Sequence, residues 1–227
     1  MLLMKDILDE KEKILHQKSK EVTLPLSNKQ KQTIKDIIEF LTNSQIPEMS
    51  EKYDLRPGMG LTPVQLGIPE RYIVIVHEYD EGKFDNYVVV NPKLVSNSEE
   101  MIYVGEGEGC LSVNREVEGI VPRFARVTIE GYDEDGNKIR VRAREDLAIA
   151  FQHELDHLEG ILFTDKIDKQ DPYKNKDLYR EIWSCKIKVD TKKMCLLFLW
   201  YNLVKEMKIC KEDLKVVKTI IIQKKRK

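Results

Sequence analysis

The sequence predicts an α+β domain in which short strands surround one interior helix. Three observations lead to this fold class. The β-branched runs Tyr72–His77 and Tyr87–Val90 are typical of strands. Farther along the chain, Arg126–Tyr132 and Lys138–Arg142 flank an Asp-Gly pair, which predicts a hairpin. The third observation is a helix over Glu145–Glu159, whose end is marked by a glycine at the next position.

Another helix is predicted nearer the N-terminus, over residues 28–42. Apolar side chains recur there at i, i+3, i+4 and i+7, which is one face of a helix. They are Ile34, Ile37, Ile38 and Leu41. Ser27 or Asn28 is suited to cap its first turn. The polar, proline-containing residues 43–57 predict a surface loop.

The composition is that of a globular protein. Of 227 residues, 41% are hydrophobic and 34% charged, with 11 Gly and 8 Pro, which excludes collagen, low-complexity disorder and a polytopic membrane protein. The first apolar patch is broken at once by charges, unlike a secretory signal. The longest apolar run, Met194–Tyr201, is far shorter than the ~20 residues that span a bilayer. Since four cysteines give no dense disulfide framework, we expect a cytoplasmic location.

The net charge of −1 hides an uneven distribution. Residues 169–227 carry 17 Lys and Arg against 7 Asp and Glu, whereas residues 1–168 carry 21 against 32. We therefore expect one acidic domain over residues 1–168 and a basic C-terminal extension over residues 169–227. The acidic charge of the domain argues against DNA binding.

The most informative motif is H-E-x-x-H, at His153, Glu154 and His157 in the predicted helix. Residues four apart on a helix lie one turn apart on the same face, so both imidazoles can bind one metal ion. The glutamate can then act as a general base. The alternative is a surface helix with two unrelated histidines. It is disfavoured because the chain has only 4 His, and two of them have this spacing.

A catalytic metal site needs a third protein ligand. No histidine follows His157, so the third histidine of many zinc peptidases is absent, although a downstream Asp or Glu remains an alternative. Upstream, Cys110 lies in a glycine-rich stretch and is the only cysteine outside the extension. A thiolate with two imidazoles suits iron(II), zinc, nickel or cobalt.

These residues resemble the peptide deformylase family at three motifs, in the family's order and separation. The first, G-x-G-L-A-A-x-Q, reads G-M-G-L-T-P-V-Q over Gly58–Gln65. The second, E-G-C-L-S, is intact at Glu108–Ser112, and the third, Q-H-E-x-D-H, is intact at Gln152–His157. The likeness covers about residues 1–168 and is to the type common in Gram-positive bacteria.

The resemblance implies a hydrolase that removes the formyl group from the N-terminal formyl-methionine of newly made polypeptides. It also implies antiparallel strands around a central metal-binding helix, and one divalent metal ion, with iron(II) favoured over zinc, nickel or cobalt. The implied metal ligands are Cys110, His153 and His157. Glu154 would move the proton from water to the departing amine. The Gln65 amide and the Leu111 backbone N–H would stabilise the oxyanion.

Substrate-binding candidates follow from the same motifs. They are Met59, Gly60, Gly109 and Ile149. The two glycines would let an extended peptide pair with the backbone. Ile149 lies one helical turn before His153, so it either lines an apolar pocket for a methionine side chain or packs in the core.

Three charged residues are candidates for supporting the site. By resemblance, Glu108 and Arg123 form an ion pair that orients the Cys110 loop. Asp156 accepts a hydrogen bond from a ligand histidine, holds a neighbouring loop, or is a solvated charge.

Two rival functions share part of this pattern. A zinc peptidase would share H-E-x-x-H but take a different third ligand, so it would keep its metal after Cys110→Ser. A catalytically weakened, deformylase-like binding protein is supported only by Thr62 and Pro63, which replace the family's paired alanines. We expect this departure to affect pocket shape and rate but not the metal ligands.

The extension holds Cys185, Cys195 and Cys210, which are too widely spaced for a zinc knuckle. Its basic end, residues 223–227, is either a solvated terminus or a contact to ribosomal RNA. The expected partners are therefore N-formyl-methionyl nascent peptides and, through the extension, the ribosome. No membrane partner is expected.

Overall fold

The computed structural model describes residues 1–80 and 82–182. Its main sheet has five antiparallel strands in the order β1-β2-β3-β6-β7. They are β1 Gly60–Leu61, β2 Tyr72–Asp80, β3 Lys83–Asn97, β6 Arg126–Tyr132 and β7 Lys138–Arg144. A smaller sheet has the order β5-β4-β8, in which β8 runs parallel to β4. Its strands are β4 Met101–Val104, β5 Arg123–Phe124 and β8 Arg180–Ile182.

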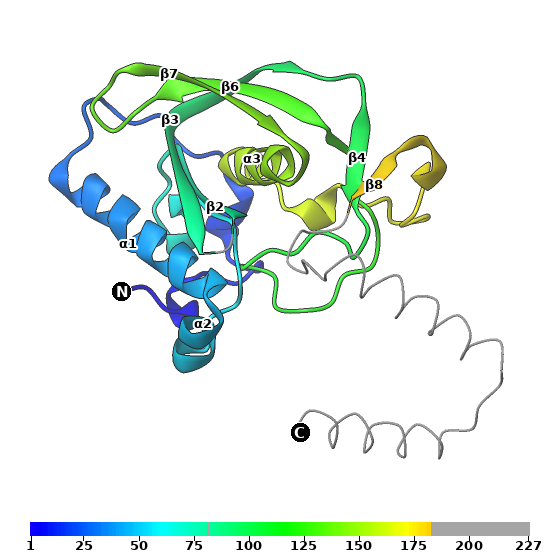
Figure 1. The fold of residues 1–227 in the computed structure, drawn as a ribbon, viewed down its shortest axis with the longest axis horizontal. Coiled ribbons are helices and arrows are strands. Elements are labelled where there is room, and N and C mark those ends of the chain that lie inside the picture. The colour runs from blue at the N-terminus through cyan, green and yellow to red at the C-terminus, as the bar shows by residue number, and fades with distance from the viewer. Residues whose placement is uncertain (81, 183–227) are drawn as a thin grey trace, which may run out of the picture. The chain divides into compact units, whose positions relative to one another are not determined.

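Three α-helices accompany these sheets in the described residues. They are α1 Asn28–Gln45, α2 Pro47–Tyr53 and α3 Glu145–Leu158. Five short 3-10 turns connect other elements. They are η1 Met4–Asp6, η2 Lys13–His16, η3 Pro63–Leu66, η4 Phe163–Asp165 and η5 Lys176–Leu178. Figure 1 shows α3 in the middle, with the main sheet curving around it and α1 outside the sheet.

Strand β2 is buried on both faces, and this explains its run of β-branched residues. The even-numbered side chains from Tyr72 to Val76 pack with α1, for example against Ile37 and Leu41. The odd-numbered Ile73 and Ile75 pack with α3 and its Phe151. Since successive strand side chains point to opposite faces, β2 joins two hydrophobic cores.

Helix α3 is interior, as the sequence predicts, and its end is fixed by Gly160. Nine of its fourteen residues are buried, so it has hardly any solvent face. Gly160 has a φ of +74°, and a Cβ there would lie 2.7 Å from the His16 carbonyl carbon. A glycine is therefore required where the helix stops.

The predicted α+β fold, strands, hairpin and both helices are confirmed, and Ser27 caps α1 with its side chain. The predicted surface loop over residues 43–57 is wrong. Helix α1 extends to Gln45, and α2 follows with Pro47 in its first turn. Proline is favoured there because a backbone N–H in the first turn has no acceptor within the helix, so the lack of one in proline costs no hydrogen bond.

The chain continues to pack on the body beyond residue 168. Strand β8 pairs with β4, and Arg180 forms ion pairs with Glu100 at 2.8 Å and Glu145 at 2.7 Å.

No helix in the described part of the chain is long and apolar enough to cross a membrane. The predictions on Cys185, Cys195, Cys210, Met194–Tyr201 and the basic end concern residues outside the described ranges.

Candidate metal centre

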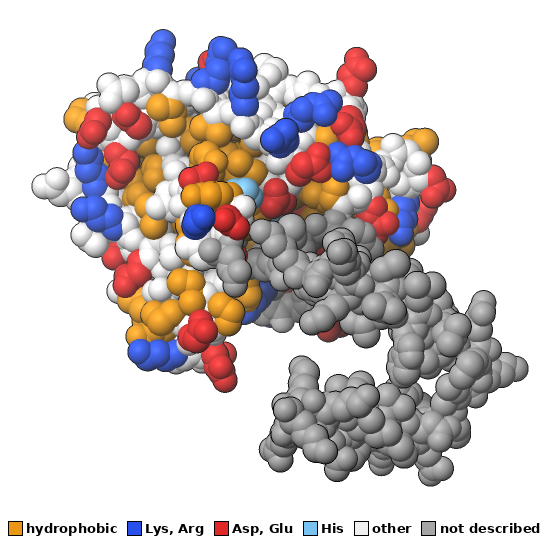
Figure 2. Space-filling view, viewed as in Figure 1, with side chains coloured by type: hydrophobic (Ala, Val, Ile, Leu, Met, Phe, Trp, Pro, Cys, Tyr) orange, Lys and Arg blue, Asp and Glu red, His pale blue; other side chains and the backbone are white. Residues whose placement is uncertain are grey.

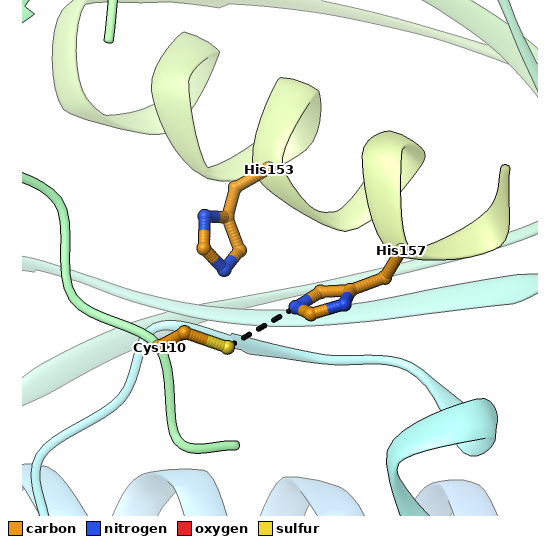
Figure 3. A group of neighbouring side chains, drawn as sticks. All are labelled: Cys110, His153 and His157. Atoms are coloured by element: carbon orange, nitrogen blue, oxygen red, sulfur yellow. Dashed lines mark hydrogen bonds between the residues drawn. The ribbon is translucent and has the colours of Figure 1, made fainter. Parts of the chain in front are cut away.

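Cys110, His153 and His157 converge on one point (Figure 3). Each offers one ligand atom, and these atoms all lie within 4.8 Å of one another. Helix α3 supplies both imidazoles from adjacent turns, and the loop after β4 supplies the thiol. The Cys110 Sγ lies 3.2 Å from Nε2 of His157.

The chemistry of these groups fits a divalent transition metal. Burial lowers the pKa of His157 well below its ordinary value, so its imidazole is neutral and able to bind a metal. His153 turns Nδ1 toward Glu108 Oε2, at 3.0 Å, which leaves its Nε2 for the cluster. Burial acts to lower the pKa of His153, but contacts to Cys110 and Glu108 raise it well above its ordinary value; a cation bound at this point would lower that pKa and replace the proton. One sulfur and two imidazole nitrogens form an open site of the kind that catalytic metals occupy.

Glu154 is buried beside this cluster. Burial raises the pKa of its carboxyl group to about 7, which a cation bound nearby would lower. Its Oε2 has no hydrogen-bond partner in the described residues. A Cβ on Gly60 would lie only 2.4 Å from Oε1, so the absence of a side chain at Gly60 makes room for the carboxylate.

A buried ion network supports the cysteine loop and α3 together. Arg123 donates to both Glu108 oxygens at 2.6 and 2.9 Å, and to Asp156 Oδ2 at 2.5 Å. Asp156 also pairs with Lys166, at 3.1 Å, so it connects neighbouring segments, and in the described residues its carboxylate has no hydrogen bond to His153 or His157. Burial acts to raise the pKa of Glu108, but Arg123 outweighs it and holds that pKa at about 2.

Gln65 lies on η3 with its amide directed at the cysteine loop. Its Nε2 is 3.7 Å from Cys110 Sγ and 3.2 Å from Ser112 Oγ. Its Oε1 accepts from the backbone N–H and the hydroxyl of Thr62, at 3.0 and 3.2 Å. The threonine therefore fixes which end of the Gln65 amide faces the cluster, and Pro63 is the first residue of η3.

The remaining candidate residues differ in how deeply their side chains are buried. Leu111 is buried and packs against Gly58, where a Cβ would lie 2.8 Å from Leu111 Cδ1. A Cβ on Gly109 would meet nothing within 4 Å, so the loop is open there. Met59 is partly buried beside the α3 core, whereas Ile149 is buried in a cluster with β4 residues.

Sequence reasoning missed two residues of this site. Ser112, within the second motif, contacts the Gln65 amide. Arg56, just before the first motif, donates to backbone carbonyls of the cysteine loop. Only their closeness to the motifs could have indicated them, because a contact to a distant backbone oxygen leaves no pattern in the sequence. Figure 2 shows a small patch of histidine atoms at the surface, bordered by hydrophobic and charged side chains.

An α+β fold whose interior H-E-x-x-H helix faces a cysteine defines a class, the metal-dependent hydrolases. Comparison with known proteins narrows this class. The sequence profile of the polypeptide deformylase family matches residues 4–173. The chain therefore belongs to the polypeptide deformylase family.

Individual relatives agree with this assignment. The chain is 49% identical to peptide deformylase of Shouchella clausii over 175 residues, which cover 77% of this chain and 96% of the relative. It is 44% identical to peptide deformylase 2 of Bacillus subtilis over 174 residues, 77% and 95% of the two chains. Among solved structures, peptide deformylase from Thermotoga maritima superposes with a TM-score of 0.56 at 29% identity, covering 71% of this chain and 96% of that one.

Proposed function

We propose that this chain binds one divalent metal ion through Cys110, His153 and His157, and that the native ion is iron(II), with zinc, nickel or cobalt as substitutes. The reaction is that of the family, the hydrolytic removal of the formyl group from the N-terminal formyl-methionine of newly made polypeptides. The observation that carries the proposal is the convergence of the three ligand atoms within 4.8 Å, next to a buried carboxylate.

The bound ion would act as a Lewis acid and lower the pKa of a water molecule. Glu154 would take the proton that water gives up and pass it to the departing amine nitrogen, so that water and the formamide become formate and a free amine. The carboxyl group of Glu154 is buried, and its Oε2 has no hydrogen-bond partner among the described residues, so this oxygen is available to take up the proton.

The oxyanion that forms on the formyl carbon needs hydrogen-bond donors. Gln65 Nε2 lies beside Cys110, and the Leu111 N–H has no acceptor in the described residues. We assign both groups to this role, in which each donor is worth ~3 kcal/mol.

The peptide would bind along β1. This strand is at the edge of the main sheet, with β2 on one side only, so its other edge can accept an extended chain. Gly60 lies in this strand, next to Met59, and Gly109 faces open space across the site. Ile149 would contribute to the apolar pocket for the methionine side chain.

The experiment incubates iron-loaded protein with formyl-Met-Ala-Ser without oxygen and measures formate. We expect formate from the wild type and only background from Glu154→Ala with its metal retained. Equal formate from both proteins would contradict the role of Glu154. Absence of formate from both would favour a weakened, binding-only protein. Cytoplasmic location and ribosome contact through the extension stay predictions.

A further inference from the structure

Arg56 makes an unusual set of contacts with the cysteine loop. Its Nη2 donates to the carbonyl oxygens of Cys110 at 2.8 Å and of Val113 at 3.0 Å. Its Nη1 donates to Asn114 Oδ1 at 2.7 Å and to the Leu111 carbonyl at 3.4 Å. No carboxylate in the described part of the chain forms an ion pair with Arg56. A single half-buried guanidinium therefore binds four of the five loop positions from 110 to 114, three through their carbonyls and one through its side chain.

The carbonyl of Cys110 belongs to the same peptide unit as the N–H of Leu111. Because a peptide unit is planar and trans, holding its oxygen also fixes the direction of its N–H, which points the opposite way. A charged donor on the oxygen also polarises the amide, which makes its N–H a stronger donor. The guanidinium is suited to this task because its planar fork can span several acceptors at once.

We propose that Arg56 is a positioning residue, which orients and polarises the Cys110–Leu111 peptide so that the Leu111 N–H faces the oxyanion. This inference rests on the proposed function of Leu111. It also connects two motifs, because Arg56 directly precedes the stretch in which Gly58 packs against the Leu111 side chain.

The loop has other attachments, so its fold does not depend on Arg56. The Ser112 carbonyl accepts from the Glu10 N–H at 2.8 Å, and Asn114 donates to Asp9 at 2.9 Å. The Glu108–Arg123 ion pair holds the other side of the loop. The Val113 N–H also donates to the Cys110 carbonyl, at 3.1 Å, so removal of Arg56 should loosen this peptide unit without freeing it and should leave the metal ligands in place.

The test compares Arg56→Ala and Arg56→Lys with the control Arg115→Ala. Arg115 lies on the same loop, but it is exposed, and among the described residues it pairs only with Glu10, at 2.7 Å. Loss of an oxyanion donor lowers kcat by about 100- to 1000-fold, so a misdirected donor should cost about 10- to 100-fold. We expect this fall for Arg56→Ala, with KM within about twofold of the wild type and metal content unchanged. Arg56→Lys should recover part of the rate, and Arg115→Ala should equal the wild type.

A second measurement separates positioning from general stability. Added guanidinium ion should raise the kcat of Arg56→Ala but not that of Arg115→Ala or the wild type, because only the first lacks the guanidinium that binds the Cys110 carbonyl. A kcat within twofold of the wild type would overturn the inference. So would a raised KM with unchanged kcat, or loss of metal with no response to guanidinium. An inactive wild type would instead overturn the proposed function.

Discussion

Replacement of Arg123 by methionine should destabilise the protein far more than loss of an exposed arginine. The Arg123 side chain is 2% exposed and that of Glu108 is 4% exposed, so the variant leaves a carboxylate buried without its partner. The pKa of Glu108 is held at about 2, against an ordinary value of 4.5. This difference corresponds to about 3 kcal/mol of folding free energy at neutral pH. For a chain of this size, about 3 kcal/mol lowers Tm by about 6–12 °C.

The assay is thermal unfolding at equal metal concentration, with Arg140→Met as the matched control. Arg140 and its partner Glu130 are 60% and 42% exposed, and such surface pairs contribute about 0–1 kcal/mol. Because the pKa of Glu108 is depressed in the fold, its contribution is present above pH 4.5 and lost as pH falls toward 2. The deficit of Arg123→Met should therefore shrink in acid, and adding Glu108→Gln should recover part of it at neutral pH. Equal Tm shifts for Arg123→Met and Arg140→Met would refute this reasoning.

Three further perturbations have defined outcomes. Gly60→Ala should lower kcat about tenfold or more, measured as formate release, because its Cβ would displace the Glu154 carboxylate; an unchanged rate would show that Glu154 can move away without loss. Thr62→Val keeps the side-chain volume but removes the hydroxyl donor to Gln65 Oε1, so unfolding in urea should show a loss of about 1 kcal/mol and kcat should fall a few-fold. The hydrogen bond to Asp146 raises the pKa of His77. Burial acts to raise the pKa of Asp146, but the contact with His77 outweighs it and lowers that pKa. Asp146→Asn should therefore be less stable than the wild type between about pH 4 and 6.5, and the gap should close as pH rises through the pKa of His77 in the folded protein. A gap that persists at pH 9 would contradict an ionic contact.

Local patterns predicted the parts of the fold that local forces determine. The hairpin of β6 and β7 follows from Asp-Gly at its turn, and the helix that carries His153 and His157 follows from the H-E-x-x-H spacing and Gly160. Helix α2 was missed because it has only seven residues, too few to show an apolar period. Its signal was Pro47 in the first turn, which is favoured at the start of a helix.

Contacts between distant segments could not be predicted in the same way. Glu108 reaches His153 across 45 residues, and Arg56 reaches the Cys110 carbonyl across 54. The pairing of β8 with β4 is equally remote in the chain. Such contacts depend on where the fold brings the backbone, which a single sequence does not encode as a pattern. The resemblance to a family indicated Glu108 and Arg123, but it gave no indication of Arg56.

The central claim is that Cys110, His153 and His157 hold the one metal ion on which deformylation depends. Metal-free protein can be titrated with iron(II) without oxygen while formate release from formyl-Met-Ala-Ser is measured. The account predicts that the rate rises to a plateau at one iron per chain, and that Cys110→Ala stays near background over the same range. Full activity without metal, or a Cys110→Ala variant that reaches the wild-type plateau at one iron per chain, would contradict it.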